Sequence, residues 1–99
     1  MTTADVFRAL ADPTRREILR ELGESELSAG DIASQFDMTA PSISRHLAIL
    51  QTAGLIHQRR DGNKRFYSAD AGVLAGAFND MLSAVCPTQQ RNRRKRKSS

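Results

Sequence analysis

Residues 27–50 read LSAGDIASQFDMTAPSISRHLAIL, and this stretch contains two helix-start signals eleven residues apart. In the first signal, Ser28 is placed to cap a helix whose third position is Asp31. In the second, Thr39 is placed as the cap and Pro41 lies in the first turn, where its missing N–H costs nothing. The predicted turn between the helices, residues 35–38, is short enough to fix their axes at a steep angle. The stretch therefore predicts a helix-turn-helix.

The second of these helices has two opposite faces on a helical wheel. One face is apolar and is predicted to lie in the core; it contains Ile43, Leu47, Leu50 and Gly54. The opposite arc holds Ser44 and Arg45, flanked by Ser42 and His46. Short donors and one Arg are typical of a helix that contacts base edges in the major groove. An ordinary amphipathic helix with a solvated polar face is the alternative.

A basic β-hairpin is predicted directly after this helix. Two short strand-like runs flank Asp61-Gly62-Asn63, and four basic side chains crowd the loop: Arg59, Arg60, Lys64 and Arg65. Phe66 and Tyr67 are expected to turn one ring to the core and one to the flank. The hairpin has the character of a wing that contacts phosphates beside a recognition helix. The alternative is a charged edge that prevents sheets from aggregating.

Helices are also expected at both ends of the folded part. Thr2 or Thr3 caps the first, Asp12-Pro13 begins the next, and Asp70 opens the last. The stripe of apolar side chains from Val73 to Val85 is wider than one small core requires, which indicates a partner surface. We therefore expect a two-fold interface that contains Val6, Phe7, Leu74, Ala77, Phe78, Met81, Leu82 and Val85. A last helix packed only on its own domain is the alternative.

The end of the chain differs in composition. Residues 91–97 contain six basic side chains in seven, and removing these six charges from the formal net charge of +4 leaves −2 for the rest. We predict two parts: a folded domain over residues 1–86, and a disordered basic tail over residues 87–99. The tail is expected to follow DNA phosphates or to be a solvated end.

Composition favours a cytoplasmic binding protein. The single cysteine, Cys86, rules out an intramolecular disulfide, and no apolar run approaches the roughly 18 residues of a membrane span. No nucleophile, base and orienting group form a recognisable constellation, so we expect no enzyme and no cofactor. We also expect no metal site, because His46, His57 and Cys86 lie in segments that do not make a four-ligand set.

Four segments together resemble the ArsR/SmtB family of small bacterial repressors: residues 11–19, 40–50, 53–56 and 66–68. The resemblance covers about residues 3–85. It implies a mainly α-helical winged helix-turn-helix, with about five helices and a small β-hairpin. It also implies a homodimer that binds double-stranded DNA at a palindromic operator, such as its own promoter, until a signal releases it. The recognition-helix contacts implied for this chain are Ala40, Ser42, Ser44, Arg45 and His46, and we add the predicted cap Thr39 as a candidate DNA contact.

The sequence departs from the metal-sensing members of that family. Those that sense soft metals carry Cys-x-Cys in the first helix of the helix-turn-helix, whereas residues 27–33 here contain no thiol. Zinc-type members use Asp and His pairs on the last helix, and no His lies between Asp70 and Val85. The chain therefore resembles the autorepressor-like members without metal sites. A redox response through Cys86 is left open.

Two functions are consistent with these observations. The first is a DNA-binding repressor. The second is a protein-interaction module of a signalling or toxin-immunity operon that uses the helix-turn-helix to dock a protein. Basic side chains in the recognition helix, the hairpin and the tail favour the first function.

Overall fold

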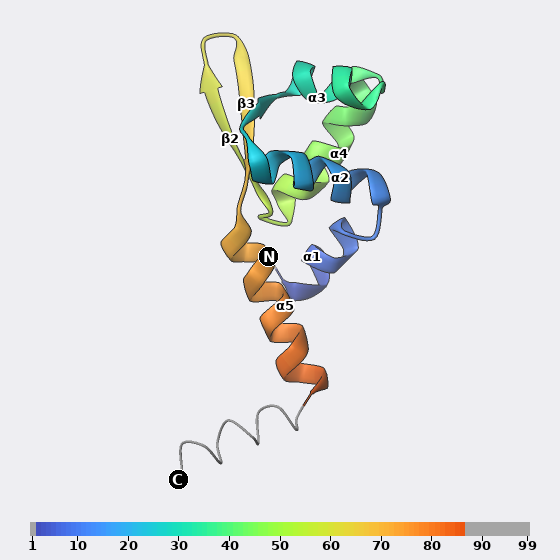
Figure 1. The fold of residues 1–99 in the computed structure, drawn as a ribbon, viewed down its shortest axis with the longest axis vertical. Helices are drawn as coiled ribbons and strands as arrows, with labels where there is room; N and C mark the ends of the chain where they lie inside the picture. Colours follow the sequence, from blue (N-terminus) through green and yellow to red (C-terminus); the bar gives the residue numbers. More distant parts are fainter. Residues whose placement is uncertain (1, 87–99) are drawn as a thin grey trace.

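The computed structural model describes residues 2–86; Met1 and residues 87–99, which include the predicted basic tail, lie outside the described residues. Within residues 2–86 the elements are α1 (Thr3–Ala9), α2 (Pro13–Glu24), β1 (Leu27–Ser28), α3 (Ala29–Phe36), α4 (Ala40–Thr52), β2 (Ile56–Asp61), β3 (Lys64–Ala69) and α5 (Ala71–Val85). Figure 1 shows the β2–β3 hairpin beside α2, α3 and α4, while α5 runs away from this body with α1 next to its first half. The predicted fold class is confirmed.

Every helix begins at a side-chain cap that the sequence predicted: Thr2, Asp12, Ser28, Thr39 and Asp70. At Ser28 the capping box is complete, because its Oγ accepts the Asp31 N–H at 3.1 Å and the Asp31 carboxylate accepts the Ser28 N–H at 3.4 Å. Such caps satisfy N–H groups that have no partner inside the helix. The start of each helix is therefore determined by a nearby side chain that accepts backbone N–H groups of the first turn.

The turn between α3 and α4 differs from the prediction by two residues. Gln35 and Phe36 continue α3, and the turn begins at Asp37, whose φ of 51° is left-handed. An Asp tolerates this conformation better than most residues with a Cβ, and it is a common way to end a helix. The turn is thus shorter than expected, and α4 still begins at the Thr39 cap.

The sheet has three antiparallel strands in the order β1-β3-β2, one more than the predicted hairpin. The added strand pairs Leu27 with Tyr67 and Ser28 with Phe66. Two residues are too few to produce a strand pattern in the sequence, so only the helix cap was recognised there. The hairpin loop is Gly62-Asn63, with Asp61 inside β2, and φ is left-handed at Gly62 (63°). A glycine with this φ at the first loop position is typical of a type II′ turn.

The core is one cluster that all five helices and the sheet share. The large side chains predicted to face inward on α4 are buried: Ile43, Leu47 and Leu50. Ile18, Leu19 and Leu22 of α2 are buried with them. Tyr67 is buried and Phe66 is half-buried, as the hairpin pattern predicted. The longest helix, α5, contributes only Ala77 to the buried set. Most of its apolar surface is therefore not used by the chain's own core.

Two arginines hold the corner between α1 and α2. Nε of Arg15 donates to the Ala9 carbonyl at 2.6 Å, and Nη1 of Arg16 donates to the Leu10 carbonyl at 2.7 Å. These carbonyls lie at the end of α1, where the helix supplies no partner for them. Residues 11–19, which carried part of the family resemblance, therefore fix the angle between the first two helices.

Acid is expected to destabilise this fold. The carboxyls whose pKa is lowered include Asp5, by hydrogen bonds from Thr2, Glu26, by the Arg59 guanidinium, and Asp70, by His57. A lowered pKa in the folded state stabilises it above the ordinary value, 3.8 for Asp and 4.5 for Glu, and the contribution is lost as the pH falls through the folded pKa. The melting temperature, followed by circular dichroism, should therefore fall below about pH 4.5.

The variant Asp5→Asn, Asp70→Asn serves as the control for this prediction. It should be less stable at pH 7 and should lose less stability on acidification than the wild type, because two of the shifted groups are absent. A wild-type melting temperature that is constant from pH 6 to pH 3 would contradict the assignment.

Candidate nucleic-acid interface

Helix α4 exposes a face made of short and basic side chains. Thr39, Ala40, Ser44 and Arg45 are exposed, whereas Ser42 and His46 are half-buried. The Thr39 hydroxyl accepts the Ser42 N–H at 3.3 Å and donates to the Ser42 Oγ at 3.0 Å. The Thr39 hydroxyl is thus occupied by the cap, while the proton of the Ser42 hydroxyl can still be donated.

Arg45 is the only basic residue of α4 that is exposed and always charged. It borders a depression of about 340 Å³ between α4 and α1, whose other lining includes Asp5, Arg8, Ile49 and Thr52. A guanidinium at this place can swing along the helix surface toward a ligand in front of α4. Its fork of donors matches the two acceptors of a guanine edge.

His46 lies differently from its neighbours on the helix. Its ring is half-buried, and Nδ1 lies 3.4 Å from Nη1 of Arg15 on α2. No sequence pattern indicated this contact, because the two residues are 31 positions apart. His46 is therefore connected to the body of the protein as well as to the exposed face of α4.

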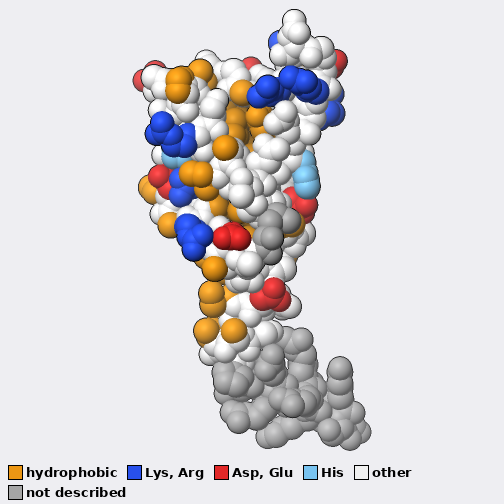
Figure 2. All heavy atoms as spheres, turned by 180° about the vertical axis from the view of Figure 1, so that it is seen from behind, with side chains coloured by type: hydrophobic (Ala, Val, Ile, Leu, Met, Phe, Trp, Pro, Cys, Tyr) orange, Lys and Arg blue, Asp and Glu red, His pale blue; other side chains and the backbone are white. Residues whose placement is uncertain are grey.

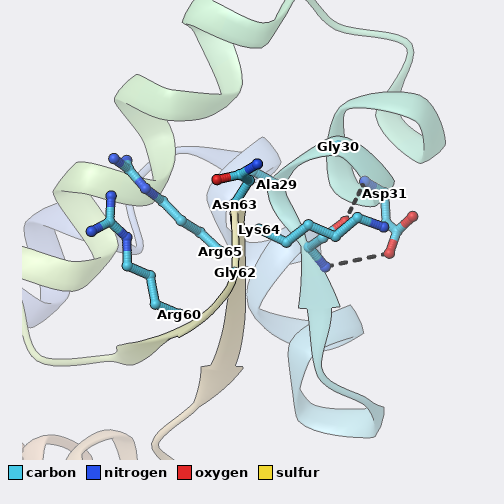
Figure 3. Close-up of a pocket in the computed structure, with 9 residues that line it drawn as sticks. Ala29, Gly30, Asp31, Arg60, Gly62, Asn63, Lys64 and Arg65 are labelled. Atoms are coloured by element: carbon cyan, nitrogen blue, oxygen red, sulfur yellow. Dashed lines mark hydrogen bonds between the residues drawn. The ribbon is translucent and has the colours of Figure 1, made fainter.

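The basic side chains of the hairpin divide between its two faces. Arg60 lies directly opposite Arg65, and Lys64 lies opposite Asp61. Successive side chains of a strand alternate, so Arg60 and Arg65 share one face. In Figure 3 these two side chains point to the same side of the hairpin, and Lys64 points to the other side, toward Asp31 at the start of α3. A depression of about 690 Å³ lies between the wing tip and the start of α3.

Arg59 differs from the other three basic residues of the wing. Its Nε and Nη2 donate to the Glu26 carboxylate at 3.1 and 2.8 Å, and its guanidinium lies 4.8 Å from the centre of the Phe66 ring. The hydrogen bond with Glu26 raises the pKa of Arg59. Arg59 thus joins the wing to the segment before β1. On sequence alone Arg59 belongs with the predicted phosphate contacts, because its partner Glu26 is 33 residues away and cannot be recognised from the sequence.

One side of α5 exposes four large apolar side chains, which we name the α5 apolar face: Phe78, Met81, Leu82 and Val85. Their exposed fractions are 48%, 38%, 46% and 63%, respectively. The Phe78 ring packs edge-on against Phe7 of α1, with the ring centres 5.2 Å apart. Figure 2 shows hydrophobic atoms at the surface in the narrow region that α5 forms. This face is continuous with α1.

The remaining residues of the predicted interface lie deeper. Val6 and Ala77 are only 3% and 6% exposed and belong to the chain's own core, and Phe7 and Leu74 are half-buried against it. The apolar stripe of α5 is therefore divided: one side packs on the chain's own core, and the α5 apolar face is exposed.

Two further properties concern the described residues alone. Within residues 2–86 no group of three or more His, Cys, Asp or Glu side chains is arranged to hold a metal ion. In the same part of the chain, none of the helices combines the length and the apolar character needed to cross a membrane.

Comparison with known proteins gives consistent matches. A family model of a helix-turn-helix domain matches residues 2–59. The chain is 44% identical over 81 residues to the transcriptional repressor SdpR of Bacillus subtilis, which covers 82% of this chain and 90% of SdpR.

Two solved structures have the same fold. An ArsR-like transcriptional regulator from Rhodococcus sp. RHA1 superposes with a TM-score of 0.77 at 32% identity, covering 97% of this chain and 90% of that one. The homodimeric winged helix-turn-helix DNA-binding domain Mb0332 of Mycobacterium bovis gives a TM-score of 0.69 at 29% identity, covering 82% and 76% of the two chains.

Proposed function

Because the chain belongs to the ArsR family of winged helix-turn-helix transcriptional regulators, we propose that it represses transcription as a homodimer on a palindromic operator. In this proposal the two copies of α4 enter successive major grooves on one side of the DNA, about 34 to 36 Å apart. The wings contact the phosphates beside them. The protein acts by binding and not by catalysis, and its release from DNA needs no transition metal.

The exposed face of α4 carries this proposal. The helix contains no acidic residue, the exposed residues of its first half are Ala40, Pro41, Ser44 and Arg45, and its opposite face is buried in the core. A helix with these properties can approach base edges closely without repelling the phosphates. Because Ile43, Leu47 and Leu50 fix its rotation, the same residues always face outward.

The Arg60 and Arg65 pair adds support from the wing. Two like charges directly opposite each other destabilise an antiparallel pair of strands. A negatively charged ligand that lies against this face would remove the repulsion. DNA phosphates supply that charge, so the wing gains stability in the complex that it lacks alone.

Selection from a random DNA pool tests the proposed function. The purified protein should enrich an inverted repeat whose half-site centres are about 10 to 10.5 base pairs apart. In a promoter-reporter assay, the protein should then lower transcription from a promoter that carries this repeat. Recovery of sequences no different from the input pool would reject sequence-specific binding, and enrichment of a single, non-repeated half-site would reject the dimer.

Alanine substitutions in the wing should separate phosphate contacts from the structural arginine. Arg65→Ala and Lys64→Ala should weaken binding to the operator and to scrambled DNA by the same factor. Each should make the slope of log affinity against log salt shallower by about 0.9 for each phosphate that the variant no longer neutralises. Fluorescence anisotropy over a salt series measures both quantities.

Arg59→Ala is the matched control, because it removes the same charge from the same hairpin. Its guanidinium is held by Glu26, so the salt slope should remain that of the wild type. A slope reduced as much as in Arg65→Ala would show that Arg59 also contacts phosphate.

A further inference from the structure

Arg15 lies where three helices meet. Its side chain is only 13% exposed, and its nitrogens are directed to different helices. Nε donates to the Ala9 carbonyl and Nη2 to the Arg8 carbonyl, at 2.6 and 3.3 Å, so both bind the end of α1. Nη1 lies 4.0 Å from the Asp12 carboxylate at the start of α2 and 3.4 Å from Nδ1 of His46 on α4.

The chemistry of this contact determines the state of the histidine ring. An arginine side chain has five donors, no acceptor, and a charge that it keeps at any ordinary pH. A nitrogen that forms a hydrogen bond with Nη1 can therefore only accept it. A hydrogen bond across the 3.4 Å between Nη1 and Nδ1 of His46 requires an Nδ1 without a proton, which places the proton of the neutral ring on Nε2.

Resting on the proposed function, we propose that Arg15 is a positioning residue for DNA recognition. It holds His46 in the Nε2–H tautomer and in one ring orientation, so that Nε2–H donates to an acceptor atom of the DNA. His46 is half-buried and follows Arg45 directly in α4, so it flanks the exposed face that is proposed to contact DNA. The acceptor is a base-edge atom or a phosphate oxygen, and substitutions of His46 distinguish these two.

The position of Arg15 is set independently of DNA. Its bonds to the α1 carbonyls and its place in the first turn of α2 are part of the fold. The ring of His46 is therefore oriented before DNA arrives, which lowers the entropy that its contact with DNA costs.

Nuclear magnetic resonance tests the positioning directly. The chain has two histidines, so long-range correlations between ring protons and nitrogens in ¹⁵N-labelled protein at pH 8 can be assigned with His57→Gln. We expect the His46 ring to be protonated at Nε2 alone. Arg15→Lys keeps the charge but loses the planar fork, and it should shift His46 toward a mixture of tautomers without changing His57.

Either of two results would overturn the positioning role. One is a proton on Nδ1 of His46 in the wild type. The other is a His46 tautomer that Arg15→Lys leaves unchanged. Circular dichroism of Arg15→Lys confirms that the variant is folded, and if it is not, the wild-type tautomer alone decides.

Two substitutions of His46 test the contact with DNA. A glutamine at position 46 places its amide nitrogen, a donor, near the position of Nε2, whereas an asparagine places its amide nitrogen near the position of Nδ1. If Nε2–H donates to DNA, His46→Gln should bind the operator within about twofold of the wild type, and His46→Asn about three- to tenfold more weakly. Weaker binding of His46→Asn to the operator alone identifies a base-edge acceptor, and equal weakening on scrambled DNA identifies a phosphate.

Equal weakening in both variants, or none in either, would reject the Nε2–H contact. These outcomes are distinct from failure of the proposed function. If the wild-type protein selects no operator, the proposed function is wrong, while the tautomer measurement still decides whether Arg15 orients His46.

Discussion

Replacing Met81 or Phe78 by Glu should produce a monomer that no longer binds the operator. Both side chains belong to the α5 apolar face, and they are 38% and 48% exposed in the single chain. A carboxylate in the centre of an apolar interface would be buried without a partner, which costs more than the interface gains there. In the proposed complex, loss of the dimer also separates the two copies of α4 that bind the operator together, which lowers affinity by about 10² to 10⁴.

Sedimentation equilibrium at micromolar concentration and operator binding should be measured on the same samples. Met81→Glu is the sharper variant, because Phe78 also packs against Phe7 within the chain. Asn79→Glu adds the same charge at an exposed position of α5 outside the α5 apolar face, so it should remain dimeric and bind DNA. A wild-type protein that sediments as a monomer would contradict the prediction, as would a dimeric Met81→Glu.

Local features of this fold could be predicted from the sequence, because their causes lie within a few residues. Ser28 and Thr39 cap helices through bonds to residues three positions on, and a capping residue can be recognised without knowledge of the fold. The buried face of α4 follows from the spacing of its apolar side chains. For the same reason, the exposed face of α4 was predicted together with the core.

Contacts between distant residues could not be predicted in this way. Glu26 holds Arg59, and Arg15 contacts His46, across 33 and 31 positions of sequence. A pattern of charges shows which residues are basic but not which of them have a partner elsewhere. Four basic residues near one loop therefore looked equivalent, although the Glu26 carboxylate holds Arg59 in place.

The difference between Arg59 and the pair Arg60 and Arg65 could have been predicted from the sequence. If the loop is taken as Gly62-Asn63, strand alternation places Arg60 and Arg65 on one face and Arg59 on the other. The predicted three-residue loop obscured this, because a shift of one residue moves every side chain to the opposite face. The division of the α5 stripe was less accessible, since its width shows surplus apolar surface but not which residues, such as Ala77, the core uses.

Arg45→Ala should reduce binding to the operator by about 1 to 3 kcal/mol, roughly 5- to 150-fold, and should affect scrambled DNA little. Arg45 is exposed on the face of α4 that is proposed to contact bases, and its planar fork can bind both acceptors of a guanine. Scrambled DNA rarely places a guanine in that register, so the substitution removes only a general attraction between charges there.

Arg45→Lys is the matched control, because it retains the positive charge and removes the planar guanidinium group. It should bind scrambled DNA like the wild type and lose most of the preference for the operator, since a lysine makes a point contact with no fixed geometry. Both variants should be compared on operator and scrambled duplexes at one salt concentration, as affinities at different salt cannot be compared. If Arg45→Lys keeps full preference and Arg45→Ala weakens both duplexes alike, Arg45 contacts phosphate. Base discrimination by α4 would then depend on its serines and on the His46 ring that Arg15 orients.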